Sequence, residues 1–77
     1  MLRELLEFIA RSIVDDPDAV TVSEEREDDT IVLRLSVGQD DVGKVIGRGG
    51  RVARAIRAVM RAAATKSGEF VSVEILG

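Results

Sequence analysis

Two apolar patterns with helical spacing meet at a short glycine-rich segment, GRGG, at residues 47–50 of this 77-residue chain. The aliphatic pair Val45 and Ile46 comes directly before the segment, and a second helical pattern follows it over residues 51–66. Glycine allows a tight reversal, and the start of a helix presents unpaired backbone N–H groups. The segment therefore predicts an exposed turn between two helices, at a place that favours a phosphate group.

The other patterns predict one more long helix, one short helix and three strands. Leucine and isoleucine recur at helical spacing over residues 2–14, and Pro17 ends that pattern. Residues 40–46 are long enough for about two helical turns. Each strand has one mostly polar side, which predicts an α+β fold: a three-stranded sheet with all three helices on one face. Alternating apolar and polar residues place the strands at residues 19–25, 30–37 and 69–76.

Composition excludes several classes of function. A chain of this length has room for one small domain. It contains no cysteine and no histidine, which removes disulfides, zinc clusters, thiol nucleophiles and imidazole bases. No pair of carboxylates lies in an apolar setting, so we expect no enzyme activity. Glu4 and Glu7 interrupt the N-terminal apolar run, so we expect neither a signal peptide nor a membrane span there. We therefore expect a cytoplasmic protein.

The net charge of −3 hides a strong asymmetry. Residues 1–43 carry 4 basic and 12 acidic side chains, whereas residues 44–77 carry 7 basic and 2 acidic ones. The second half can therefore attract phosphates at short range although the whole chain is acidic. An acidic cluster in the predicted hairpin favours solubility and a turn, and would repel nucleic acid on that side. Its members are Glu24, Glu25, Glu27, Asp28 and Asp29.

Two nucleotide-binding motifs fail on single residues. Residues 38–45 match the start of a P-loop, but Val45 stands where Ser or Thr must bind magnesium. Residues 47–52 fail the dinucleotide pattern because Val52 replaces its last glycine. We therefore expect no small-molecule substrate and no nucleotide cofactor.

The pattern I-G-x-x-G between two helices, present as VIGRGG, resembles the KH domain. It lies within strand, helix, loop, helix and strand over about residues 30–77, the minimal KH unit. The extra helix and strand, about residues 2–25, precede this unit as in the bacterial type II arrangement. Almost all of the chain is similar to the small stand-alone bacterial KH proteins of the KhpA (YlqC-like) family. Gly49 departs from the longer polar residue expected at its position.

The resemblance implies one type II KH domain over residues 1–77 that clamps about four nucleotides of single-stranded RNA through their backbone. It also implies an RNA chaperone or post-transcriptional regulator linked to cell shape, elongation or division. Because Cys and His are absent, we expect no metal ion. The residues expected to contact RNA are Lys44, Gly47, Arg48, Gly49, Gly50, Arg51 and Arg54, with Gly43, Val45 and Ile46 in the adjoining groove.

Three residues on the helices that flank the loop, Arg57, Arg61 and Gly43, can each be interpreted in two ways. Arg57 and Arg61 lie two or more turns beyond the loop, so we interpret them as a solvated helix face. A glycine at position 43, inside a helix, is explained either by the close approach of a neighbouring helix or by the close approach of RNA, and the sequence allows both.

Aromatic residues that could stack on RNA bases are scarce. The chain has no Trp or Tyr, and Phe8 and Phe70 belong to apolar patterns. Base stacking is therefore not expected, and sequence specificity for RNA should be modest.

Small side chains on the last helix predict an assembly surface. Such a strip lets two helices approach closely, so we expect a homodimer or a heterodimer with another KH-domain protein. The alternative function is a protein-interaction module that works through these contacts without binding RNA. The strip consists of Ala55, Ala58, Ala62 and Thr65.

Overall fold

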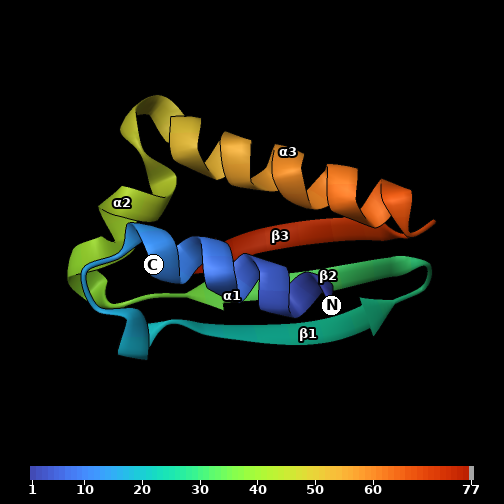
Figure 1. Cartoon of the computed structure of the whole chain (residues 1–77), viewed down its shortest axis with the longest axis horizontal. Coiled ribbons are helices and arrows are strands. Elements are labelled where there is room, and N and C mark those ends of the chain that lie inside the picture. The colour runs from blue at the N-terminus through green and yellow to red at the C-terminus, as the bar shows by residue number, and fades with distance from the viewer. Residues whose placement is uncertain (77) are drawn as a thin grey trace.

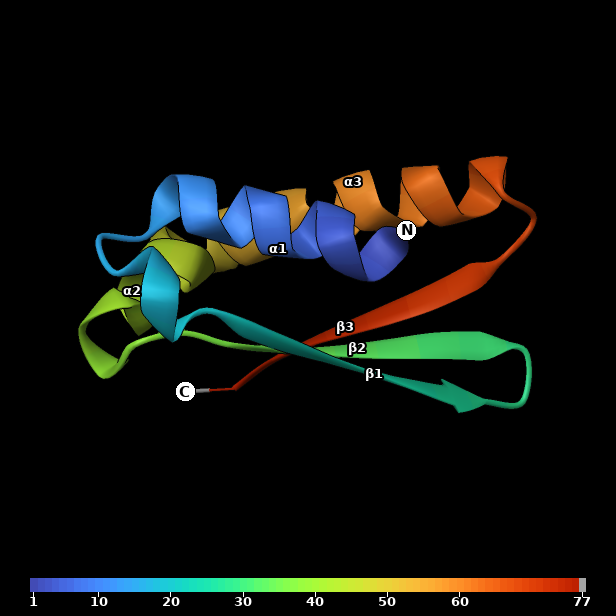
Figure 2. The same cartoon turned by 60° about the horizontal axis from the view of Figure 1, so that its bottom comes forward.

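One three-stranded sheet and a layer of helices on one of its faces make up the chain (Figure 1). Turning the molecule shows the helices on one side and the opposite face of the sheet left open (Figure 2). The computed structural model describes residues 1–76. The elements are α1 (Leu2–Ile13), β1 (Thr21–Glu27), β2 (Thr30–Ser36), α2 (Val42–Ile46), α3 (Arg51–Lys66) and β3 (Phe70–Leu76), with 3-10 turns η1 (Pro17–Ala19), η2 (Gln39–Asp41) and η3 (Arg48–Gly50).

The strand order is β1-β2-β3, so β2 is the middle strand. β1 and β2 form an antiparallel hairpin, whereas β2 and β3 are parallel and are joined by the crossover through α2 and α3. Leu33 of β2 pairs with Val73 of β3, and Leu35 lies between Val22 and Ile75. The parallel pairing places α3 over the sheet beside β3, with the glycine segment at the far end of α3 from its link to β3 (Figure 1).

The core lies between the sheet and the helices. Its contributions from α1 and α3 come from residues at helical spacing, which is the pattern that the sequence analysis used. Leu6, Leu33, Leu35, Val45 and Met60 are completely buried. The α+β class, the three-stranded sheet and the single covered face are therefore confirmed.

Element ends differ from the sequence prediction mainly in the hairpin. β1 extends to Glu27, two residues beyond the predicted end, so the turn consists only of Asp28 and Asp29. Asp28 has a φ of 55°, a left-handed conformation that Asp tolerates better than most residues. Arg26 and Glu27 thus continue the antiparallel pairing, where the sequence predicted a longer turn.

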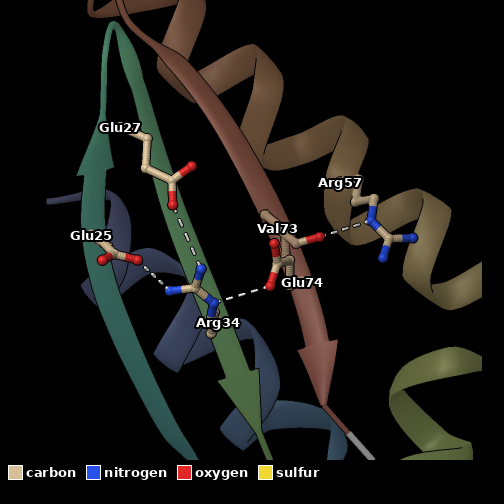
Figure 3. A network of polar contacts seen from close by, with 6 residues as sticks. All are labelled: Glu25, Glu27, Arg34, Arg57, Val73 and Glu74. Atoms are coloured by element: carbon tan, nitrogen blue, oxygen red, sulfur yellow. Dashed lines mark hydrogen bonds and ion pairs between the residues drawn. The ribbon is translucent and has the colours of Figure 1, made fainter.

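A network centred on Arg34 lies on the open face of the sheet (Figure 3). The guanidinium of Arg34 lies 2.7 Å from Glu25, 3.8 Å from Glu27 and 3.0 Å from Glu74. Hydrogen bonds to Glu25 and then Glu74 raise the pKa of Arg34 above its ordinary value. Val32 alternates with the core residues and so lies on this face, yet it is only 5% exposed. Two members of the predicted acidic cluster thus form ion pairs in the sheet.

Candidate functional site

The glycine segment forms the tight turn η3 between α2 and α3. Gly47, Gly49 and Gly50 have φ values of 76°, 62° and 81°, a region that L side chains rarely adopt. The backbone N–H of Gly50 donates to the carbonyl oxygen of Gly47 at 3.1 Å, and the N–H of Gly47 donates to that of Gly43 at 2.9 Å. The exposed Arg48 lies within this turn. The predicted exposed turn between two helices is confirmed.

Two of these glycines serve different purposes. A Cβ on Gly47 would lie 2.5 Å from Cγ2 of Val52 and 2.8 Å from its backbone nitrogen, so only glycine fits against the first turn of α3. A Cβ on Gly49 would meet nothing within 4 Å. Gly47 therefore permits the packing of the loop against α3, whereas Gly49 leaves the outer surface of the loop bare.

The start of α3 carries positive charge and no side-chain cap. Its N-cap is Gly50, and within residues 1–76 no side chain accepts a hydrogen bond from the first backbone N–H groups. Arg48 and Arg51 are exposed beside these groups. Arg54, one turn further along, donates from Nη1 to the carbonyl oxygen of Gly49 at 2.8 Å. This corner presents N–H groups, the positive end of a helix and two exposed guanidinium groups, an arrangement that attracts an anion.

Lys44 has ion-pair partners that the sequence analysis did not predict. Its Nζ lies 3.1 Å from Oδ2 of Asp15 and 3.4 Å from Oδ1 of Asp41. The hydrogen bond to Asp15, and to a smaller extent the one to Asp41, raise the pKa of Lys44 above its ordinary value. Asp41 is 3% exposed, and it also accepts hydrogen bonds from the backbone N–H groups of Asp15 and Asp16 at 3.2 and 3.0 Å. The charge of Lys44 is therefore balanced within the molecule.

The three residues expected in the groove occupy different environments. Gly43 is exposed, and a Cβ there would meet nothing within 4 Å, so close helix packing does not explain this glycine. Ile46 is half-buried. Val45 was also expected in the groove, and the structure has its side chain completely buried in the core. Val45 thus lies on the buried side of α2, whereas Gly43 and Lys44 lie on its exposed side.

Arg57 and Arg61 contribute to a feature that the sequence analysis missed. Arg57 donates from Nε to the carbonyl oxygen of Val73 at 3.1 Å (Figure 3). A hollow of about 140 Å³ between α3 and β3 is lined by these two arginines together with Val71, Ser72 and Val73. The three- and four-residue spacing of Arg54, Arg57 and Arg61 placed them on one side of the helix. Arg57 and Arg61 line a groove only because β3 lies next to this side of α3.

The predicted small-residue strip is accessible. Ala55, Ala58, Ala62 and Thr65 are all exposed on α3. A wholly apolar groove of about 350 Å³ lies alongside, between α1 and α3, and includes Phe8 and Val59, which are 70% and 49% exposed. The side of α3 next to α1 thus presents an apolar surface.

The residues that the structure describes, 1–76, contain no cluster of three or more His, Cys, Asp or Glu side chains that could hold a metal ion. In the same range, none of the helices has both the length and the apolar character needed to cross a membrane.

The fold and the glycine loop together define a type II KH domain. Comparison with known proteins agrees: the family described as KhpA/KhpB, KH domain, matches residues 3–75, and the chain belongs to this family. It is 52% identical over 75 residues to the RNA-binding protein KhpA of Clostridium acetobutylicum, covering 97% of this chain and 100% of the relative. It is 49% identical to the RNA-binding protein KhpA of Clostridium perfringens with the same coverage.

Solved structures of Era share the fold. The crystal structure of Aquifex aeolicus Era bound to GDP and AlF4⁻ matches with a TM-score of 0.66 and 17% sequence identity. The match covers 96% of this chain but only 29% of Era. Era in complex with MgGDPNP and a segment of 16S ribosomal RNA matches with the same TM-score and covers 28% of that protein. At this level of identity the likeness concerns the fold.

Proposed function

We propose that this chain is a non-catalytic RNA-binding protein whose glycine loop clamps the backbone of single-stranded RNA. One observation carries the proposal: the loop presents the uncapped start of α3 between Arg48 and Arg51, with no Cβ on Gly49 in the way. Relatives at 52% and 49% identity bear the name RNA-binding protein, which supports the same ligand. Phosphates bind at the loop through N–H groups and guanidinium groups.

Beyond the glycine loop, the bound RNA strand extends through the hollow beside β3. Arg57 and Arg61 line that hollow, so we assign them to RNA contact, in place of the solvated role expected from sequence. The glutamates around Arg34 lie on the open face and disfavour a polyanion there. Phe8 and Phe70 are exposed, but neither lines the hollow beside the arginines. Recognition therefore relies on backbone charge, with modest sequence preference.

The cellular role follows from the family resemblance. We propose a cytoplasmic RNA chaperone or post-transcriptional regulator, connected with cell shape, elongation or division. The exposed strip on α3 and the apolar groove beside it support self-association or pairing with another KH-domain protein. Small side chains let the second helix approach closely, and Phe8 supplies apolar area at the edge.

The test of RNA binding is the double substitution Arg48→Asp with Gly49→Asp. It places two carboxylates where phosphates must pass, so binding of a single-stranded RNA in gel shifts should be lost while the fold survives. A matched control is Arg11→Asp with Gly68→Asp, because it changes the net charge equally and Gly68 also has positive φ and open space. The control should bind as the wild type does.

Salt dependence gives a second measure of the same contact. Two to four phosphate contacts predict a slope of about −1.5 to −3 in log K against log salt, at ~0.7 per phosphate on a single strand. If the double variant binds RNA as strongly as the wild type does, the loop is only a turn. A slope near zero for the wild type would show the same. Absence of any RNA binding would favour the interaction module instead.

A further inference from the structure

Asp15 and Lys44 form an ion pair beside the proposed clamp. Lys44 lies in α2, and the glycine loop starts three residues later. Asp15 belongs to the connection after α1, and its side chain is 81% exposed while that of Asp41 is 4% exposed. The two carboxylates thus approach one ammonium group, one from the solvent side and one from the interior.

Asp41 holds Asp15 in this position. Its Oδ1 and Oδ2 accept hydrogen bonds from the backbone N–H groups of Asp15 and Asp16, which fixes the chain after α1 against the start of α2. The side chain of Asp15 is therefore carried to Lys44 by the backbone, at low cost in chain entropy. An ammonium that faces two carboxylates has no net positive charge to offer to a phosphate.

We infer that Asp15 is a positioning residue that lowers RNA affinity by competing with a phosphate for Lys44. The inference rests on the proposed function, because it assumes that RNA reaches the glycine loop. A phosphate that approaches Lys44 must displace Asp15, the exposed partner, and Asp41 then remains as the internal partner. Asp15 thereby sets how much the lysine contributes to the clamp.

The test is Asp15→Asn in the full chain, with a single-stranded RNA as the probe. The substitution keeps the backbone N–H that donates to Asp41 and removes only the charge of the carboxylate. We expect affinity to rise about 1.5- to 5-fold, the range that exposed ion pairs span. The slope of log K against log salt should become steeper by up to about 0.7, because one further phosphate is neutralised.

Two control variants separate this mechanism from a general charge effect. Asp18→Asn removes the same charge from an exposed residue that has no ion pair among residues 1–76, and it should change affinity less. In a Lys44→Met background, Asp15→Asn should give no gain, since the competing lysine is absent. Thermal unfolding of each variant confirms that the fold is retained.

The outcomes are distinguishable. A gain that requires Lys44 supports the inference. No gain, an equal gain from Asp18→Asn, or a gain that persists without Lys44 would overturn it and leave the clamp intact, provided that wild type binds and the Arg48 and Gly49 double variant does not. If the wild-type chain itself binds no RNA, both the inference and the proposed function fail.

Discussion

Nη1 of Arg54 donates to the carbonyl oxygen of Gly49 across a distance of 2.8 Å, so the end of the first turn of α3 braces the loop that precedes the helix. From its place near the loop in the sequence, Arg54 was expected only to contact phosphate. In the structure, part of its guanidinium is engaged with the loop, and a loop held in one conformation loses less entropy when a ligand binds.

Replacing Arg54 should therefore loosen the loop without unfolding the protein. We expect Arg54→Met to weaken RNA binding several-fold and to lower the free energy of unfolding by less than about 1.5 kcal/mol, as for one exposed hydrogen bond. Amide hydrogen exchange should rise at residues 48–50. Arg57→Met removes the same charge but a different contact, to Val73, and should leave exchange in the loop unchanged. Equal exchange in both variants would contradict the bracing role.

Alanine at Gly47 and at Gly49 should have very different effects on stability. Gly47 has φ 76° and ψ 171°, a region that only glycine occupies readily, and its Cβ would clash with Val52. Gly47→Ala should cost about 2–4 kcal/mol of the free energy of unfolding. Gly49→Ala should cost about 1 kcal/mol, since only the left-handed conformation is disfavoured. Urea unfolding of the two variants measures the difference, and equal costs would contradict the packing of the loop on α3.

Asp41 should make stability depend on pH in the acid range. Burial would raise its pKa, but hydrogen bonds from the N–H groups of Asp15 and Asp16 and from Lys44 outweigh it, so the pKa lies below the ordinary 3.8. Its contribution is present above pH 3.8 and is lost as pH falls through the lower folded value. Wild type should therefore melt several degrees above Asp41→Asn near neutral pH, and this gap should narrow below about pH 4. A constant gap from pH 7 to pH 2 would contradict this assignment.

The strip on α3 should control self-association. We expect wild type to sediment as a dimer at micromolar concentration and Ala62→Arg as a monomer, because a long charged side chain prevents the close approach of a second helix. Ser23→Arg adds the same charge to an exposed position of β1 and should leave the dimer intact. A monomeric wild-type chain, or an unchanged mass for Ala62→Arg, would refute this interface.

Sequence patterns correctly predicted those helix and strand bounds that depend on residues nearby in the chain. The bounds of α3 agree with the prediction because its apolar spacing, the glycines before it and Ser67-Gly68 after it are all local signals. The end of β1 was placed too early because the strand continues through charged residues, which are stabilised by pairing with β2 and by Arg34.

The missed features of the site depend on distant segments. Asp15 and Lys44 are 29 positions apart in the chain, so no spacing rule links them. Arg57 and β3 come together only through the parallel crossover. Val45 precedes the loop in sequence, as expected, but the amphipathic character of α2 directs it into the core.

The glycine loop directly precedes α3, and the alanine strip runs along the side of the same helix. In a symmetric dimer whose α3 helices run in opposite directions, the two loops lie at opposite ends, separated by roughly the 24 Å that 16 residues span at 1.5 Å each. One RNA strand that reaches both loops binds the second at a high effective concentration. Such a dimer is bivalent, and its avidity makes long strands better ligands than short ones even when each single clamp is weak.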